Sequence, residues 1–125
     1  MKPLSFAFLL VGTTAVLIGM SWGIQMSASG DHTLSPAHAH LNLLGWVSMA
    51  IFGFYYHLVP GADEGVLPKA HFAASVGGLV LIVPGIVLAI TERGETLAKI
   101  GSVLTVLGAV LFLVVLVRTG RRSVV

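Results

Sequence analysis

Cysteine is absent from this 125-residue chain, and charged residues make up only 10% of it. Without cysteine, a disulfide framework and a thiolate metal site are both excluded. Seven basic and five acidic side chains are too few to cover the surface of a water-soluble domain of this length. The basic residues lie at the ends of apolar segments, so a nucleic-acid partner is not indicated. Together with a hydrophobic fraction of 56%, these absences indicate a small integral membrane protein.

Long apolar stretches fill most of the chain. A helix that crosses a bilayer needs about 20 mostly apolar residues. Four stretches meet this requirement, approximately residues 4–25, 37–59, 69–90 and 97–117. The connectors between them are short, so neighbouring helices should be antiparallel. The expected fold is all-α: one membrane domain over residues 1–125, built as a four-transmembrane-helix bundle.

The basic side chains set the expected orientation, because loops rich in Lys and Arg stay in the cytoplasm. Most fall on one side of the expected bundle: Lys2, Lys69, Arg118, Arg121 and Arg122, against Arg93 and Lys99 on the other. Both termini should therefore be cytoplasmic, in a bacterial-type inner membrane. Small residues at 27–29 are typical of a signal-peptide cleavage site, but the apolar stretch before them is long for a signal. We therefore expect the first span to be retained.

Small residues recur at spacings that are typical of close helix contacts in membranes. The pairs are Gly19 and Gly23, Ala73 and Gly77, Ala74 and Gly78, and, on one face of the fourth span, Gly101 and Gly108. Such positions let two helix backbones approach each other closely. Pro84 lies inside the third span, where proline predicts a kink.

Histidines are frequent in the stretch "SPAHAHLNLLGWVSMAIFGFYYHLVP", which contains the second span. Ionisable residues within a membrane are costly, so they suggest a function. His38 and His40 lie in the first turn of this span. Each helical residue advances by about 100°, so residues two apart point about 200° away from each other. The pair therefore predicts two sites on opposite flanks of the helix, or one site completed between copies of the chain.

Haem suits such a pair, because the macrocycle supplies four nitrogens and the protein needs to add only one or two axial ligands. The small side chain of Ala39 would let a flat ring approach, and Trp46 and Phe52 could pack on it. Asn42 has two interpretations: it could polarise an adjacent ligand or form a hydrogen bond across helices. The simpler alternative for the pair is interfacial histidines that bond to water or backbone.

Two other functional interpretations remain open. Copper or zinc could bind His38, His40 and their symmetry mates in a non-haem metal protein. Alternatively, the chain is a cofactor-free structural or assembly subunit. His57 and His71 should both lie near the inner face, where they could form a second metal or proton-relay site, or act as interfacial anchors. His32 falls in the outer loop.

The stretch also resembles a known family. The matching segments are "GDHT" at 30–33, "AHAH" at 37–40, Gly45, and "GFYYHLVP" at 53–60. They resemble the tenth helix of subunit I of the haem–copper oxidases, including the nitric oxide reductase branch. The resemblance covers about a quarter of the chain. It implies that His38 and His40 are axial ligands of b-type haem, and that the task is electron transfer or the binding of O2 or NO.

The resemblance is partial. The family's copper-binding helix has no counterpart here, so no complete haem–copper centre is visible and redox enzyme activity stays open. The family's helices form three arcs with pseudo-threefold symmetry, and each arc has as many helices as this chain has expected spans. Three copies would reproduce that arrangement. We therefore predict a homotrimer, with a dimer as its main competitor. An electron-transfer protein is a further candidate partner, whose identity the sequence does not give.

Overall fold

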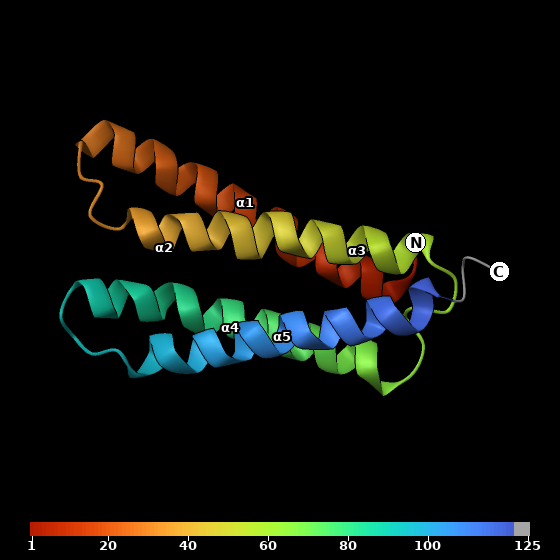
Figure 1. Ribbon diagram of the computed structural model, residues 1–125. Coiled ribbons are helices and arrows are strands. Elements are labelled where there is room, and N and C mark those ends of the chain that lie inside the picture. The colour runs from red at the N-terminus through yellow and green to blue at the C-terminus, as the bar shows by residue number, and fades with distance from the viewer. Residues whose placement is uncertain (122–125) are drawn as a thin grey trace.

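The computed structural model describes residues 1–121, and within that range every regular element is helical (Figure 1). The elements are α1 (Pro3–Ser29), α2 (Ser35–His40), the π-helix η1 (Leu41–Val47), α3 (Ser48–Leu58), α4 (Val66–Ile90) and α5 (Thr96–Gly120). The expected all-α class is confirmed. Arg122, which contributed to the expected orientation, lies outside the described residues.

The helices form two antiparallel pairs. α2, η1 and α3 follow one another without a break and form one rod, so the bundle has four rods in chain order: α1, this second rod, α4 and α5. The second rod lies beside α1, while α4 pairs with α5 (Figure 1). Both ends of the chain lie at the same end of the bundle, which we call the termini end. The connectors 30–34 and 91–95 lie at the opposite end, where α1 diverges from α2 (Figure 1). His38 and His40 belong to this opposite end.

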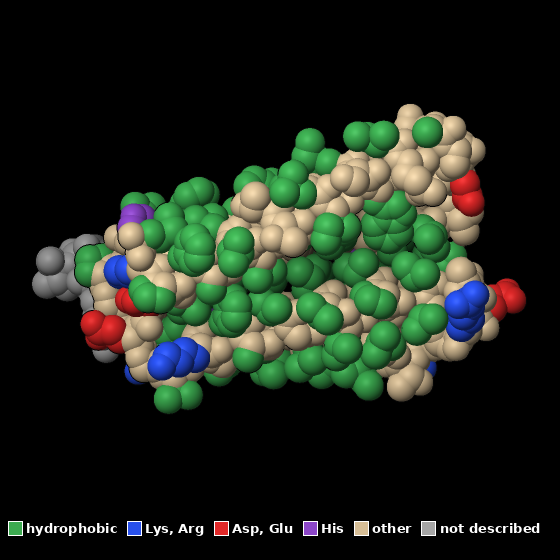
Figure 2. Space-filling model, turned by 180° about the vertical axis from the view of Figure 1, so that it is seen from behind, with side chains coloured by type: hydrophobic (Ala, Val, Ile, Leu, Met, Phe, Trp, Pro, Cys, Tyr) green, Lys and Arg blue, Asp and Glu red, His purple; other side chains and the backbone are tan. Residues whose placement is uncertain are grey.

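Apolar side chains surround the bundle. Figure 2 shows them along its length, with Lys, Arg, Asp and Glu gathered at the two ends. α1, α4 and α5 are each long and apolar enough to cross a membrane. The chain is thus consistent with a multi-pass membrane protein. That the rod from Ser35 to Leu58 also crosses the bilayer stays a prediction.

The π-helical turn was not expected, because the apolar stretch 37–59 predicts a regular α-helix. η1 begins directly after His40 and runs for seven residues. The Ser48 hydroxyl donates a hydrogen bond to the carbonyl of Leu43 at 2.9 Å, five residues earlier. π-Helical segments are rare and occur frequently at functional sites. Side chains after Leu41 therefore point in directions that a regular α-helix would not give them.

Glycines bring α4 and α5 into backbone contact. A Cβ added at Gly101 would lie 2.5 Å from the backbone nitrogen of Ile82. One added at Gly78 would lie 2.8 Å from the backbone nitrogen of Thr105. The expected close approach at these positions is confirmed, whereas a Cβ at Gly77 would meet nothing nearer than 3.9 Å. Pro84 lies within α4 without ending it.

An aromatic cluster joins all four rods at the termini end. Phe8 of α1 stacks on Tyr56 of α3 with ring centroids 5.6 Å apart. His71 of α4 lies 5.2 Å from Phe112 of α5, with the two rings stacked. Phe8, Tyr56 and His71 are fully buried. The cluster therefore fixes how the two helix pairs meet.

Candidate haem-ligand site

The ring of His40 is held by its own helix. Its Nδ1 lies 2.7 Å from the carbonyl oxygen of Pro36, one turn earlier. A carbonyl can only accept, so Nδ1 carries the proton and Nε2 keeps its lone pair. Within residues 1–121, Nε2 has no hydrogen-bond partner. Histidines that bind metals through Nε2 commonly donate Nδ1–H to a backbone carbonyl in this way, which fixes the tautomer and the ring orientation.

His40 lines a groove of about 360 Å³ between the second rod and the α4–α5 pair. Most of its other lining side chains are apolar: Ala39, Leu43, Leu44, Ile82 and Val106. The hydroxyls of Ser102 and Thr105 also reach it, but they donate to the carbonyls of Ala98 and Gly101 within α5. The imidazole of His40 is therefore the one titratable group on this groove among the described residues, and the small Ala39 lies beside it.

His38 faces a different helix. Its Nε2 lies 2.9 Å from the carbonyl oxygen of Gly19 in α1, and its ring meets Trp22 edge to face at 6.0 Å. The rings of His38 and His40 thus point toward different neighbours, in agreement with the 200° separation expected from their spacing. Because a carbonyl only accepts, His38 Nε2 carries the proton here. This nitrogen is engaged by the fold and does not offer a lone pair to a metal.

Asn42 lies one turn after His38, in the interface with α1. Its amide nitrogen is 3.3 Å from His38 Nε2, and its buried amide oxygen has no partner. The protonated His38 Nε2 cannot accept from an amide N–H. Turning the Asn42 amide by 180° would place its oxygen beside that N–H, and such orientations are assigned from hydrogen bonding. Of the two interpretations of Asn42, its position against Gly19 favours the contact between helices.

We expect Gly19→Ala to lower the free energy of unfolding in detergent by about 1–3 kcal/mol, because the new Cβ would overlap the Asn42 amide. Asn42→Ala removes the obstructing atoms, so the double variant should recover part of that loss. A double-mutant cycle on unfolding midpoints measures the coupling. Strictly additive losses would show that Gly19 and Asn42 do not constrain each other.

Trp46 and Phe52 do not reach His40. A Cβ added at Gly12 of α1 would lie 3.5 Å from the Trp46 ring, so this indole lies against α1, and Trp46 is absent from the groove lining. Phe52 belongs to the aromatic cluster, 4.4 Å from His71. Trp46 lies within η1, and Phe52 follows it in α3. Their expected packing on a cofactor held by His40 therefore has no support in the geometry of a single chain.

His57 and His71 are not brought together. His71 is fully buried, and the Tyr56 hydroxyl lies 2.9 Å from its Nδ1. Its Nε2 is buried without a partner. His57 is exposed and makes no hydrogen bond or ring contact with His71. Within residues 1–121, no group of three or more His, Cys, Asp or Glu side chains lies close enough to hold a metal ion.

His32 lies apart from the pair. It is exposed in the 30–34 connector, where its Nδ1 is 3.2 Å from the carbonyl oxygen of Gly30. Next to it, the Thr33 hydroxyl and backbone N–H both donate to Asp31, which lowers the pKa of that carboxyl. This local turn orders the connector. It gives His32 no contact with His38 or His40.

A scan against protein-family models found no matching family, and searches of curated proteins and of solved structures found no match to this chain. The resemblance to subunit I of the haem–copper oxidases therefore stays a prediction from the residues. What the structure contributes is the geometry around the pair. His40 presents a free ring nitrogen to an apolar groove, and His38 bonds to α1.

Proposed function

We propose that this protein binds b-type haem within the membrane and that His40 is the axial ligand. One observation carries the proposal: the Pro36 carbonyl fixes the Nδ1–H tautomer, which leaves Nε2 of His40 free on an apolar groove of about 360 Å³. An apolar surface with one imidazole is part of what a haem pocket requires of the protein. When bound, haem supplies an iron that can exchange electrons or take up a diatomic gas.

The number of available ligands favours gas binding over simple electron transfer. His38, the other member of the pair, donates its Nε2–H to Gly19 at 2.9 Å. His40 is thus the one histidine of the pair whose Nε2 keeps a lone pair. Ligation by His40 alone would leave one coordination position open for a ligand such as O2 or NO. Electron transfer with two histidine ligands would require ligation by His38, through Nδ1 or after its Nε2 releases α1, or a ligand from another copy of the chain.

A homotrimer in a bacterial-type inner membrane completes the proposal. The groove covers only part of a porphyrin, so a neighbouring copy is the natural source of the remaining cover, and closed rings are a common form of oligomer. Lys2, Lys69, Arg118 and Arg121 all belong to the termini end. That end should face the cytoplasm under the positive-inside rule. Native mass spectrometry in detergent that shows only monomers would remove the trimer.

A cofactor-free structural subunit is the second candidate, and the hydrogen bond from His38 to Gly19 favours it. That bond shows that one histidine of the pair joins two helices, which is what polar side chains commonly do in membrane bundles. In this role the chain would contribute packing surfaces to an assembly. It would need no lone pair on His40.

The optical spectrum of the purified protein separates these functions. Haem bound by His40 alone should give a Soret band and a high-spin ferrous spectrum that shifts on addition of CO. Sharp reduced α and β bands that CO leaves unchanged would indicate two histidine ligands and overturn the gas-binding role. Colourless protein with stoichiometric copper or zinc would support the non-haem interpretation. Colourless, metal-free protein would support the structural subunit.

A further inference from the structure

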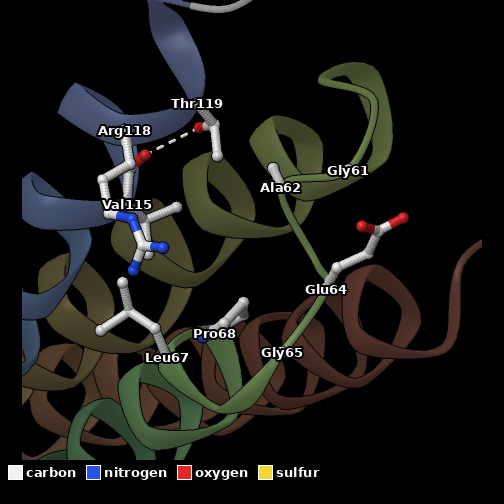
Figure 3. A pocket seen from close by; sticks show the side chains of 9 residues that line it. All are labelled: Gly61, Ala62, Glu64, Gly65, Leu67, Pro68, Val115, Arg118 and Thr119. Atoms are coloured by element: carbon white, nitrogen blue, oxygen red, sulfur yellow. Dashed lines mark hydrogen bonds between the residues drawn. The ribbon is translucent and has the colours of Figure 1, made fainter.

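A second cavity, of about 220 Å³, lies at the termini end of the bundle. It is enclosed by the 59–65 connector, the start of α4 and the end of α5 (Figure 3). Figure 3 shows the Arg118 guanidinium directed toward Leu67, with the side chains of Pro68 and Val115 beside them, whereas the Glu64 carboxylate points the other way. The cavity thus combines one cationic group with an apolar floor.

The Arg118 guanidinium has no partner within residues 1–121. Neither nearby carboxylate pairs with Arg118. Glu64 points away from it (Figure 3), and Asp63 already pairs with Lys2 at 3.3 Å. An arginine without a counter-ion beside a membrane is a strong candidate to bind a phosphate, which its planar fork of N–H donors matches.

The helix turn that carries Arg118 is anchored. The Thr119 hydroxyl donates to the Val115 carbonyl at 2.7 Å, so it must accept from the Tyr55 hydroxyl, which also lies 2.7 Å away. This contact ties the end of α5 to α3. The position of the Arg118 backbone beside the cavity is therefore set by the fold, while its side chain is exposed.

The start of α4 adds positive potential to the same place. Val66 and Leu67 open the helix after Gly65, which supplies no side-chain cap, and the first turn holds no acid. Their backbone N–H groups have no acceptor within the helix. Lys69 adds a charge one turn further on. Glu64 is the one acid on the cavity lining.

We propose that this cavity binds the phosphate of an anionic phospholipid, with Arg118 as its main contact. A lipid is favoured over free phosphate because Leu67, Pro68 and Val115 on the lining are apolar, and because Val66, the residue before Leu67, is apolar and 80% exposed. The termini end is also the basic end of the bundle, and the cytoplasmic leaflet is the anionic one. The proposal rests on the membrane orientation and is independent of haem.

Native mass spectrometry of the full chain in mixed micelles tests the lipid site. With phosphatidylglycerol or phosphatidylcholine at equal mole fraction, the wild-type chain should retain phosphatidylglycerol about tenfold more tightly, as one charged hydrogen-bonded contact allows. Arg118→Gln should abolish this preference. Arg121→Gln is the matched control, because Arg121 is a neighbouring basic residue off the cavity lining, and it should keep the preference.

Two further measurements test the lipid site even if Arg118→Gln perturbs the fold. Glu64→Gln removes the one acid on the lining and should strengthen phosphatidylglycerol binding. Inorganic phosphate, at the same concentration as the lipid headgroup, should not displace the lipid. Equal retention of the two lipids by the wild-type chain, an unchanged preference in Arg118→Gln, weaker binding in Glu64→Gln, or displacement by inorganic phosphate would each overturn the assignment.

Discussion

Replacing His40 with alanine is expected to remove haem from the purified protein. His40 carries the one imidazole on the groove among the described residues, and the bond from its Nδ1 to the Pro36 carbonyl holds the ring in place and leaves Nε2 with its lone pair. Loss of a group that merely supports a metal ligand costs about 10–100-fold in affinity, so loss of the ligand itself should cost at least that much. The haem-to-protein ratio, from the pyridine haemochrome assay, should fall at least about tenfold.

Two further variants are the controls for His40→Ala. His57→Ala replaces an exposed histidine at the other end of the same rod and should leave the haem content unchanged. His38→Ala removes the hydrogen bond to Gly19, so it should lower thermal stability while keeping haem. If His40→Ala retained haem in full, or if His38→Ala lost it while folded, the assignment of the axial ligand would be wrong.

Placing valine at Gly101 is expected to separate α4 from α5. Any Cβ at this position would lie 2.5 Å from the backbone nitrogen of Ile82 and 2.7 Å from its Cα. Backbone atoms cannot rotate away as a side chain can, so the helices must move apart along their whole contact. Overpacking costs about 1–3 kcal/mol in ordinary cores, and this substitution should reach at least the upper end of that range. The unfolding midpoint in detergent measures the loss.

Gly77→Val is the matched control for Gly101→Val. Gly77 is also in the α4–α5 pair, but a Cβ there would meet only Leu104, at 3.9 Å. The same change in volume and in helix propensity should therefore cost much less. Equal losses at the two positions would mean that valine acts through helix propensity and that backbone contact between α4 and α5 is not the cause.

The helical class was predictable because apolar length and short connectors act locally along the chain. For the same reason, it was predictable that His38 and His40 point to opposite flanks of the helix, since the advance of about 100° per residue holds within α2. His38 and His40 accordingly face different helices. The close contacts at Gly78 and Gly101 were predicted from spacing, because small residues at helical intervals form a continuous groove. The same spacing at Gly77 gave no close contact.

Other features depended on which atoms the folded chain brings together. The proton on His40 is placed by the Pro36 carbonyl, and the proton on His38 by Gly19; residue spacing does not specify a tautomer. Trp46 lies within the π-helical turn and packs against α1, a contact that residue spacing did not specify. His71 was expected near the membrane surface, yet the aromatic rings of the other three rods enclose it.

Anomalous diffraction at the iron absorption edge, on crystals of the haem-loaded protein, tests the central claim most directly. We expect one iron peak per chain, within coordinating distance of His40 Nε2 and inside the groove between the second rod and the α4–α5 pair. An iron peak beside His38, His57 or His71, or protein that crystallises without iron after expression with haem in excess, would contradict the account.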